Sequence, residues 1–509
     1  MKSNSISWAN IKYFGNELEY AKEALDSRWI SGGDFVSKFE KEVESVYRGK
    51  AFAVSNGTAA LQLALQALSV TPGDRVIVPS FCFQAAGNVL LQLGAVPVYC
   101  DVELSSWNQS LGNIQKVYDK SIKGVLLVHN YGGCHDIEKI SKWCKEKSLW
   151  LLEDCAEAWF SMCSGKLLGQ FSDIATFSMH AAKTITCGEG GLLISYREDL
   201  NERITQLRSH GLVGAPRPYM NQLAGNNYRL SNIHSAIALG QLEKRTDILE
   251  YQIARQKKYT SMLGELKFGQ LQHCIGDGIQ LWAIGFQLFP HMLTISRDDI
   301  MDLMQVSGIA TRPGFYSTDK LNYLNDESSY KNSKCLSDDI IVFPCGSDLT
   351  MTEIERTCQI FIEIVKNNTK YSVMEPSSSE YMSLLGELVE NVRSTDESFR
   401  YFDSRELSIV ADHDANFLFN LHGKAVAYGH LESEGADTWL GVCVHSGYRN
   451  QSFGSTMLKL LLATAVRQNI SVVSLTVDIN NPSAIRLYES FGFVVIKEDD
   501  TFYKMQKVF

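Results

Sequence analysis

Lys183 stands in a run whose residue types could carry out carbonyl chemistry: Phe177-Ser-Met-His-Ala-Ala-Lys-Thr-Ile-Thr-Cys-Gly-Glu-Gly-Gly191. A serine lies five residues before the lysine, and a glycine pair follows it. A lysine amine that is desolvated and held by a tight turn is nucleophilic enough to attack an aldehyde. The run therefore indicates a Schiff-base lysine, although most lysines outside such a setting are solvated surface charges.

A phosphate site is indicated by the run Ser55-Asn-Gly-Thr-Ala-Ala60, which precedes an apolar helical pattern. Glycine lets the backbone approach a ligand closely, and free N–H groups at a helix N-terminus attract anions. Gly57 and the Thr58 hydroxyl would bind the phosphate. The alternative for this run is an ordinary helix cap.

Asp154 ends an apolar stretch that is typical of a buried strand. A buried carboxylate is costly unless a cation pairs with it. A protonated pyridine nitrogen would be such a cation, and the pairing would keep the ring an electron sink, as in pyridoxal phosphate (PLP) enzymes. A salt bridge to an arginine or lysine is the alternative. Phe83 could stack on the same ring, unless it packs in the core.

The elements that must position these residues alternate between strands and helices over residues 1 to about 365. The expected buried strands are 76–78, 96–99, 124–128 and 149–153. An apolar helix face is formed by Leu61, Ala64, Leu65 and Leu68. Such alternation predicts a mostly parallel sheet flanked by helices, with ligands at the carboxyl ends of its strands.

Composition bounds the function classes. At 509 residues, two or three domains are expected. The net charge of -10 argues against a nucleic-acid binder, since phosphate contacts need a basic surface. No apolar run is long enough for a transmembrane helix, and the 12 cysteines show no zinc spacing. With no secretory signal pattern, we expect a cytoplasmic protein with reduced thiols.

A second domain is expected after a polar stretch, which places the boundary near residue 370. A strand at 371–374 and a helix start capped by serines at 376–379 come first. A hairpin follows, with His422-Gly423 as its turn, and then a strand at 438–445. The loop Gly447–Gly454 leads into a helix whose apolar face is formed by Leu458, Leu461, Leu462 and Ala465, so its backbone amides could bind a pyrophosphate.

Residues from about 5 to 365 resemble the DegT/StrS-type sugar aminotransferases, which are fold type I PLP enzymes. The matching motifs are Ser31-Gly-Gly, Asn56-Gly-Thr-Ala-Ala-Leu, Ser106-Trp-Asn, Glu153-Asp-Cys-Ala-Glu-Ala, the lysine run, Gly225-Asn-Asn-Tyr-Arg-Leu-Ser-Asn-Ile and Gly240-Gln-Leu-Glu. Glu157, which is glutamine or histidine in many relatives, and Trp107-Asn108 look most like the perosamine-synthase branch.

The resemblance implies a role for each matching residue. Lys183 would be the Schiff-base lysine, Asp154 the partner of the pyridine nitrogen, and Glu157 the neighbour of the ring's phenolic oxygen. The phosphate would be held by Gly57, Thr58, Ala59 and Ser178, with Phe83 stacked on the ring. Asn227 matches an asparagine donated to the phosphate of the neighbouring subunit, which implies a homodimer with shared active sites.

The implied reaction moves an amino group, with glutamate as donor, to a keto-sugar linked to a nucleoside diphosphate. One branch of the family replaces the lysine by histidine and performs dehydration, so Lys183 favours transamination. His180 departs from the asparagine or tyrosine of some relatives and is a candidate sugar-contacting residue, with a structural histidine as the alternative. The motifs favour amination at C4 over C3, and GDP, dTDP and UDP remain open.

Residues 371–509 resemble the GNAT acyl-CoA N-acyltransferases. The Arg-x-x-Gly-x-Gly loop of that superfamily reads Arg449-Asn-Gln-Ser-Phe-Gly454 here, and Asn480–Phe493 is its companion motif. Ser452 replaces the first glycine, which is tolerable only where the backbone need not take a positive φ. The implied acetyl-CoA site includes Val444, Arg449, Ser452, Gly454 and Asn481. Tyr488 would protonate the leaving thiolate, and core packing is the alternative for it.

The predicted architecture is a fold type I PLP-dependent transferase over residues 1–368, with a small C-terminal subdomain, followed by a GNAT α/β domain over 371–509. We expect a bifunctional enzyme that makes an amino sugar and acetylates its amine. Its general base stays open between His445, Glu432 and a water chain. A C-terminal domain that only senses acetyl-CoA is the rival interpretation, and a PLP-binding transcription regulator is disfavoured by the acidic charge.

Overall fold

A computed structural model shows the architecture of the chain. The structure describes residues 5–212, 217, 219–273, 278–324, 328, 330–374, 376, 380–395, 399, 401–403, 405–435 and 437–509. The chain divides into two compact units, and two short segments of the first 300 residues belong to the second one. Unit 1 comprises residues 1–264, 271–287 and 297–361, and unit 2 comprises 265–270, 288–296 and 362–509.

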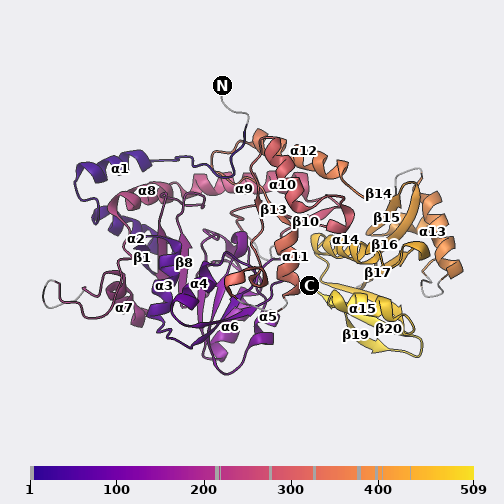
Figure 1. Ribbon diagram of the computed structural model, residues 1–509, viewed down its shortest axis with the longest axis horizontal. Helices are drawn as coiled ribbons and strands as arrows, with labels where there is room; N and C mark the ends of the chain where they lie inside the picture. The colour runs from indigo at the N-terminus through magenta and orange to yellow at the C-terminus, as the bar shows by residue number, and fades with distance from the viewer. Residues whose placement is uncertain are drawn as a thin grey trace. The chain divides into compact units, whose positions relative to one another are not determined.

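Unit 1 is built on a seven-stranded sheet of order β1-β9-β8-β5-β4-β2-β3 (Figure 1). Strands β8, β5, β4, β2 and β3 are parallel, whereas β9 is antiparallel to both β8 and β1. The strands are β1 (Lys50–Val54), β2 (Arg75–Pro79), β3 (Val96–Cys100), β4 (Ile122–Val128), β5 (Trp150–Asp154), β8 (Ile174–Ser178) and β9 (Gly191–Ser195). The carboxyl ends of the five parallel strands therefore lie at one edge.

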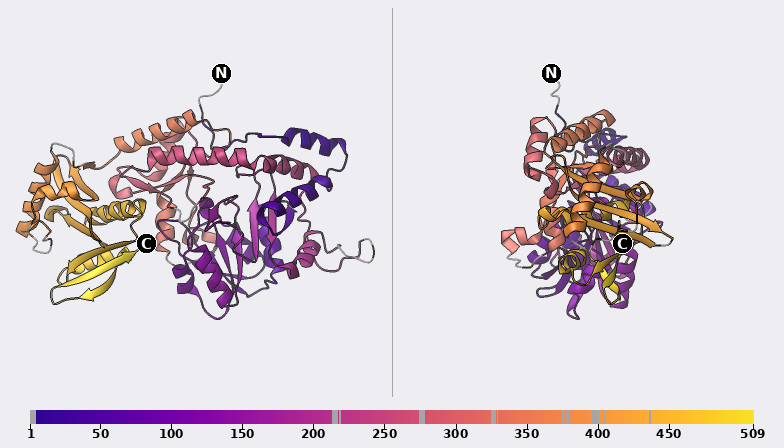
Figure 2. Two further views of the ribbon diagram at one scale, coloured as in Figure 1. Left: turned by 180° about the vertical axis from the view of Figure 1, so that it is seen from behind. Right: turned by 90° about the vertical axis from the view of Figure 1, so that its right-hand side faces the viewer.

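Helices cover this sheet. Their bounds are α1 (Glu17–Asp26), α2 (Asp34–Tyr47), α3 (Gly57–Ala67), α4 (Ala85–Gln92), α5 (Leu111–Val117), α6 (Ile137–Glu146), α7 (Glu198–Arg208), α8 (Asn232–Glu243) and α9 (Arg245–Leu263). The apolar residues of α3 join β1, β2 and β4 in one core cluster. Helices α1 and α2 pack on α8, as both views show (Figures 1 and 2). Among the described residues, no helix is both long and apolar enough to cross a bilayer.

A smaller part of unit 1 follows. Strand β13 (Ile340–Val342) pairs antiparallel with β11 (Gly285–Leu288) and β12 (Arg312–Pro313). The remaining elements of this part are α10 (Arg297–Val306), the short turns η3 (Thr318–Lys320) and η4 (Asn322–Leu324), α11 (Lys331–Asp339) and the first part of α12 (Met351–Asn367), whose last residues belong to unit 2. Strand β10 (Gly269–Leu271) crosses the division, and the turn η2 (Pro290–Met292) belongs to unit 2. The hairpin of β6 (Met162–Cys163) and β7 (Lys166–Leu167) and the turn η1 (Asn130–Gly132) lie in the larger part of unit 1.

Unit 2 contains its own seven-stranded sheet, of order β14-β15-β16-β17-β18-β20-β19. The strands are β14 (Ser372–Met374), β15 (Ala415–Leu421), β16 (Lys424–Glu434), β17 (Asp437–Val444), β18 (Val472–Asp478), β19 (Val494–Glu498) and β20 (Phe502–Val508). All neighbours are antiparallel except β17 and β18, which are parallel and pair at only two positions, 438 with 473 and 439 with 474. Beyond Trp439 the two central strands separate.

Three α-helices belong to this second sheet: α13 (Tyr381–Thr395), α14 (Phe453–Arg467) and α15 (Pro482–Ser490), with short turns η5 (Leu407–Asp412) and η6 (Ser446–Tyr448). The two segments from the first part of the chain lie within the same unit. Lys370 donates its N–H to the Met292 carbonyl at 2.7 Å, and Lys267 lies 4.9 Å from the centre of the Phe417 ring. No sequence pattern had marked these segments.

The expected strands, the helix after Asn56, the hairpin at His422-Gly423 and the apolar face of α14 are confirmed. Strand β3 differs, because it is an edge strand and only partly buried, although its apolar residues predicted a buried one. The serines expected to cap the helix near residue 380 lie outside the described residues. The eleven described cysteines are free thiols.

Candidate active site

The residues of the predicted phosphate site meet where α3 begins and β8 ends. Asn56 caps the helix, because its Oδ1 accepts the Ala59 N–H at 2.8 Å. The amides of Gly57 and Thr58 lie at the open end of the helix. A Cβ on Gly57 would lie 3.1 Å from the Ser178 Cβ, so glycine lets the turn lie against Ser178. The helix cap and the anion site are therefore compatible, but the cap uses the Ala59 amide.

Asp154, the last residue of β5, is a buried carboxylate that lacks a close cation. Its Oδ1 accepts the Ala156 N–H at 3.0 Å, and no other hydrogen bond to it is formed within the described part of the chain. The pKa of Asp154 is raised to about 6, chiefly by burial and in smaller part by the nearby Glu157 carboxylate, against the Ala156 hydrogen bond and the Lys183 charge. A cationic ring nitrogen would reverse this cost.

Lys183 points at Glu157. Its Nζ donates to the Glu157 Oε1 at 2.9 Å, and the other oxygen of that carboxylate accepts the Tyr131 N–H at 2.7 Å. Only 14% of the lysine side chain and 7% of the glutamate side chain are exposed, so solvent screens this ion pair weakly. The sequence had placed Glu157 beside the phenolic oxygen of a cofactor ring, and the structure adds that it also orients the lysine.

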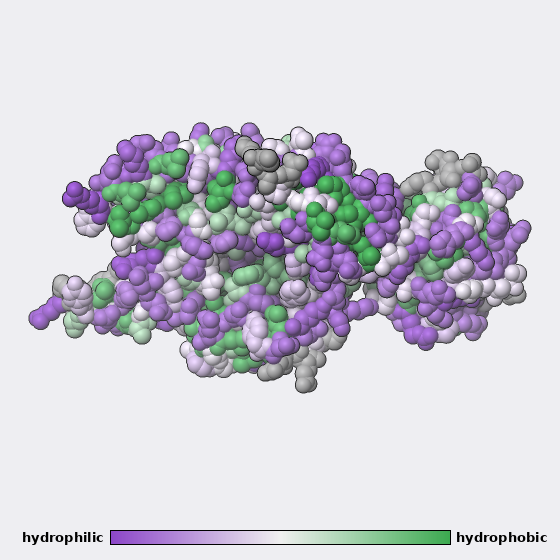
Figure 3. Space-filling view, turned by 45° about the horizontal axis from the view of Figure 1, so that its top comes forward, coloured by the Kyte–Doolittle hydropathy of each residue, from purple (hydrophilic) through white to green (hydrophobic). Residues whose placement is uncertain are grey.

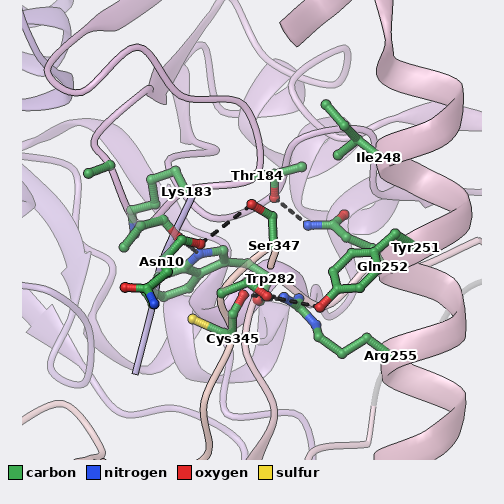
Figure 4. A pocket seen from close by; sticks show the side chains of 14 residues that line it. Asn10, Lys183, Thr184, Ile248, Tyr251, Gln252, Arg255, Trp282, Cys345 and Ser347 are labelled. Carbon is green, nitrogen blue, oxygen red and sulfur yellow. Dashed lines mark hydrogen bonds between the residues drawn. The ribbon is translucent and has the colours of Figure 1, made fainter. Parts of the chain in front are cut away.

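Trp282 and Arg255 complete the lysine's surroundings, and the sequence analysis missed both. The Lys183 Nζ lies 3.6 Å from the centre of the Trp282 ring, whose Nε1 donates to the Ala182 carbonyl at 2.5 Å. Arg255 of α9 is buried and donates to the backbone carbonyls of Trp282, Leu281 and Cys345. Figure 4 shows Arg255 extending from α9 toward Trp282, with Lys183 on the other side of the tryptophan. Arg255 thus positions the tryptophan that the lysine contacts.

A cavity of about 20 Å³ lies between α9 and the lysine loop (Figure 4). Gln252 donates to the Thr184 Oγ1 at 2.8 Å, which ties the loop to the helix. The Gln252 Oε1 and the Arg255 Nε are buried without a hydrogen-bond partner. A cavity of this size with polar walls can hold one water molecule. The only sequence signal was the spacing of two polar residues on the buried side of α9.

Phe83 and His180 lie at the open side of the site. The Phe83 ring is 66% exposed and lies 6.3 Å from the Phe315 ring, which stacks on Tyr131 at 4.8 Å. Core packing is therefore not its role, and its ring remains available to a planar ligand. His180 is about half exposed, accepts the Ala182 N–H through Nδ1 at 3.2 Å and lies 3.9 Å from the Glu189 carboxylate. A polar ligand can reach it.

Two motifs of the resemblance turn out to support loops. The Asn108 Oδ1 accepts the Asn130 N–H at 2.8 Å, and the Asn130 Nδ2 donates to the carbonyls of Phe81 and Trp107. This network fixes the loop that carries Tyr131. The Asn232 side chain occupies the space where a Cβ of Gly33 would stand, 2.7 Å away. These residues shape the site and do not line it.

Asn227 is exposed, and its Oδ1 accepts from the Arg229 Nε at 3.0 Å. The adjacent Tyr228 carbonyl accepts the Ser55 N–H at 2.7 Å, so this segment runs beside the phosphate loop of its own chain. The described residues do not bring Asn227 into hydrogen-bond contact with Lys183, Asp154 or Glu157.

The second candidate site follows the separation of β17 from β18. Val444 ends β17, and the loop to α14 begins after it. A Cβ on Gly454 would lie 3.5 Å from both Val444 and Leu487, so this glycine packs between strand β17 and helix α15. Arg449 is exposed in the loop. Ser452 adopts φ 65°, so the condition set from the sequence is not met, and the serine carries left-handed strain at the N-terminus of α14.

Tyr488 and Asn481 belong to α15. The Asn481 Oδ1 caps this helix by accepting the Ala484 N–H at 3.1 Å. Tyr488 is 8% exposed, and burial raises its pKa to about 12, with the neighbouring Cys443 as a smaller cause. Tyr488 therefore keeps its proton throughout the physiological pH range, as a proton donor to a thiolate must. Of the candidate bases, His445 already caps η6 by accepting the Gly447 N–H at 3.1 Å.

The fold and the two sites define a class. A seven-stranded, mostly parallel sheet with a lysine, a buried aspartate and a helix N-terminus at its ligand edge is a fold type I PLP-dependent enzyme. Unit 2, with its separating central strands and anion-binding loop, has the architecture of an N-acetyltransferase.

Comparison with known proteins then gives the family. The pattern of the DegT/DnrJ/EryC1/StrS aminotransferase family matches residues 14–361, and that of the acetyltransferase (GNAT) family matches residues 380–493. The chain belongs to the DegT/DnrJ/EryC1/StrS aminotransferase family and carries a GNAT domain. It is an enzyme with both transferase activities, and its cofactors are PLP and acetyl-CoA.

Relatives agree with this assignment. The chain is 34% identical over 349 residues to GDP-perosamine synthase of Vibrio cholerae, covering 68% of this chain and 95% of the relative. It is 41% identical over 237 residues to GDP-perosamine synthase of Escherichia coli O157:H7, covering 46% and 65%. The Helicobacter pylori aminotransferase PseC, involved in the biosynthesis of pseudoaminic acid, superposes with a TM-score of 0.68 at 20% identity, covering 72% of this chain and all of that one.

Asparagine at position 154 tests the buried charge. A carboxyl whose pKa is raised by folding stabilises the chain at low pH, and this contribution is lost as the pH rises through about 6. Without PLP, Asp154→Asn should therefore be more stable than wild type at pH 8 by roughly 1–3 kcal/mol, and this difference should shrink as the pH falls from about 6 toward the ordinary carboxyl pKa near 4. With PLP, its cofactor affinity should fall roughly 10²-fold. Urea unfolding and absorbance titration measure both, and a less stable variant at pH 8 contradicts the argument.

Glycine at position 452 tests the strained loop. Because Ser452 has φ 65°, Ser452→Gly should raise the free energy of unfolding by about 1 kcal/mol without weakening acetyl-CoA binding. Ser455→Gly, one turn into α14, is the matched control and should destabilise by roughly 0.5–1 kcal/mol. Denaturant unfolding and calorimetric acetyl-CoA titration give the readouts. If both variants lost the same free energy of unfolding, left-handed strain at Ser452 would be excluded.

Proposed function

We propose that the chain aminates a nucleotide-linked 4-keto-6-deoxyhexose with glutamate as donor, and acetylates the resulting amine with acetyl-CoA. The observation that carries the proposal is the 34% identity to a GDP-perosamine synthase over 95% of that relative, in a chain that continues into an acetyltransferase domain. The first unit makes a primary amine, and the second consumes one.

The residues present fit PLP. Asp154 offers a buried carboxylate for the ring nitrogen, Gly57, Thr58 and Ser178 offer the phosphate cradle, and the Phe83 ring is open to stacking. Bound PLP supplies an electron sink that makes the C–H bond beside the transferred nitrogen acidic.

Lys183 then moves the proton between the substrate carbon and the cofactor. Glu157 holds its amine at 2.9 Å, and the Trp282 ring limits the water around it. His180 faces the open side, where the sugar enters, and is proposed to contact it.

In the acetyltransferase unit, the residues divide the work between binding and proton transfer. Val444, Arg449, Ser452 and Gly454 are proposed to hold the CoA pyrophosphate at the start of α14. Asn481 fixes α15 by capping it, and Tyr488 gives its proton to the leaving sulfur. The raised pKa of Tyr488 keeps that proton in place until the C–S bond breaks.

We further propose a homodimer with shared aminotransferase sites. Support comes from the apolar surface of α1 and the turn after it, where Leu18, Leu25, Trp29 and Ile30 are exposed. Figure 3 shows hydrophobic side chains gathered there, at the upper left of that view. A second copy would cover such a surface. Asn227 is exposed and is proposed to reach the phosphate of the partner.

A reconstitution experiment tests the two reactions. The full chain, given GDP-4-keto-6-deoxymannose, glutamate and acetyl-CoA, should yield an N-acetylated amino sugar by mass spectrometry. Lys183→Ala should lose amination by at least about 10²-fold but still acetylate added GDP-perosamine. Tyr488→Phe should release free amino sugar and acetylate it about 10²-fold more slowly. If the wild type released free amino sugar and no acetylated product at saturating acetyl-CoA, the proposed acetylation would be wrong. An unchanged acetylation rate in Tyr488→Phe would favour a sensor domain.

Subunit mixing tests the shared sites. If Asn227 serves the partner's phosphate, a mixed dimer of Lys183→Ala and Asn227→Ala chains has one site with both wild-type residues. Random mixing of the two inactive variants should then restore roughly a quarter of the wild-type amination rate. Mixing Lys183→Ala with Asn201→Ala, an asparagine of α7, is the control for exchange alone. No recovery in the first mixture would place Asn227 in its own chain's site.

A further inference from the structure

A polar cluster lies on one face of the unit 2 sheet, away from the proposed CoA loop. Tyr428, His430 and Glu432 alternate along β16 and so share a face, which α13 covers. Gly429 points the other way, because a Cβ there would meet Met457 of α14 at 2.5 Å. The sequence left Glu432 as one of three possibilities for the general base and gave no role to the rest of this cluster.

The cluster contains a chain of hydrogen bonds that ends on a carboxylate. Tyr401 lies 2.8 Å from the Glu432 Oε2 and 2.6 Å from the His413 Nε2, and the Tyr428 hydroxyl lies 3.0 Å from the His413 Nδ1. An ionised carboxylate only accepts, so Tyr401 donates to Glu432. The His413 Nε2–H then donates to Tyr401, and the Nδ1 accepts from Tyr428. Every group is satisfied with His413 neutral.

Burial supports the neutral histidine. It lowers the pKa of His413, and it lowers the pKa of the adjacent His430 further. The two rings stack at 4.4 Å, and Tyr401 lies 4.1 Å from His430. The other titratable groups that face the chain are Arg405, Asp412, Asp414, Glu434, Tyr381 and Cys443.

The cluster adjoins the place where the central strands separate. Glu432 pairs with Trp439, the last residue of β17 that pairs with β18, and Lys504 lies over that tryptophan ring. The His430 ring lies directly over Gly441, where a Cβ would stand 2.3 Å from it. Only glycine leaves room for the ring at this position of the separating strand.

Tyr488 lies near the strand that pairs with this cluster. Cys443 contributes to its electrostatic surroundings and pairs with Tyr428, and positions 439, 441 and 443 of β17 point to one side. At about 3.4 Å per residue, Gly441 lies about 7 Å along the strand from Cys443 and Trp439 about 14 Å. A thioester and an amine placed beside Gly441 would lie between the tyrosine and the carboxylate. The His430 Nδ1, buried without a partner, marks a polar position between them.

From this placement we infer that Glu432 is the base that deprotonates the acceptor amine, with Tyr401 and His413 as positioning residues. The acceptor ammonium gives one proton to Glu432, which releases it to solvent. The nitrogen lone pair then forms the C–N bond, and the C–S bond breaks. Tyr488 protonates the sulfur and is reprotonated by the second proton of the nitrogen. The inference rests on the acetyltransferase activity and not on which amine is the acceptor.

The same geometry disfavours a metal at these residues. His413, His430 and Glu432 have ligand atoms within 4.8 Å of one another. Both nitrogens of His413 are already engaged by tyrosines, so coordination would break two hydrogen bonds. A chain of hydrogen bonds that orients Glu432 to accept a proton keeps both of these hydrogen bonds.

The kinetic test compares two acceptors that differ in the need for a base. Glu432→Gln in the full chain should slow acetylation of GDP-perosamine about 10²-fold at pH 7, with the loss shrinking as the pH rises. Hydroxylamine is largely unprotonated at pH 7, and its acetylation should change less than about threefold. Glu434→Gln, two residues on along the same face, is the matched control and should affect neither. If Glu432→Gln slows the acetylation of both acceptors equally, or of neither, Glu432 is not the base.

The positioning residues are tested by comparing the two acceptors and by spectroscopy. Tyr401→Phe should lower kcat for GDP-perosamine about tenfold and leave the acetylation of hydroxylamine nearly unchanged, since Glu432 loses the hydroxyl that orients it. Histidine-labelled full-length protein should show His413 as the Nε2–H tautomer by nitrogen NMR, and the Nδ1–H tautomer would overturn the chain. If the wild type acetylates hydroxylamine but not GDP-perosamine, the proposed sugar acceptor is wrong. The His413 tautomer then still tests the hydrogen-bond chain on which the inference depends.

Discussion

The uncompensated carboxylate of Asp154 is the constraint around which the aminotransferase site is arranged. Folding places it at the end of a buried strand, where burial raises its pKa to about 6. The nearest cation, Lys183, is engaged by Glu157 at 2.9 Å and is held against the Trp282 ring. The site thus keeps its own lysine away from its most costly charge. A cationic ring nitrogen supplied by the cofactor relieves that cost, so cofactor binding and fold stability are coupled through one side chain.

Much of this arrangement could be predicted from the sequence, because the informative residues lie at ends of strands with a clear apolar pattern. Asp154 and Ser178 each close a buried run, and Gly57 opens a helix. Such positions meet at one sheet edge in any parallel fold. Trp282 and Arg255 could not be found in this way. They act through a ring face and through backbone carbonyls, and neither leaves a spacing that distinguishes them from core residues.

In the loop before α14, the sequence marked the important residue but not its backbone conformation. The sequence predicted an anion-binding loop and marked the departure at Ser452. The backbone angle decides what that departure means, and φ 65° is a property of the turn as a whole. Segments 265–270 and 288–296 illustrate the same point at a larger scale. Their assignment to the second unit depends on long-range contacts, such as that between Lys370 and Met292, which local patterns do not encode.

Both units must control the protonation of an amine, one while the amine is made and the other while it is acetylated. An aminotransferase needs an amine that accepts and returns a proton, and the Lys183 amine lies for this in a site that is largely closed to water. The amine product becomes an ammonium in water at neutral pH, and an ammonium has no lone pair for attack on a thioester. An acetyltransferase that takes such a product therefore needs a proton acceptor on the amine side and a proton donor on the sulfur side. Tyr488, with its raised pKa, keeps its proton for the sulfur and so cannot take the first proton from the ammonium. The amine side thus requires a second group, and the hydroxyl of Tyr401 orients the Glu432 carboxylate for that role.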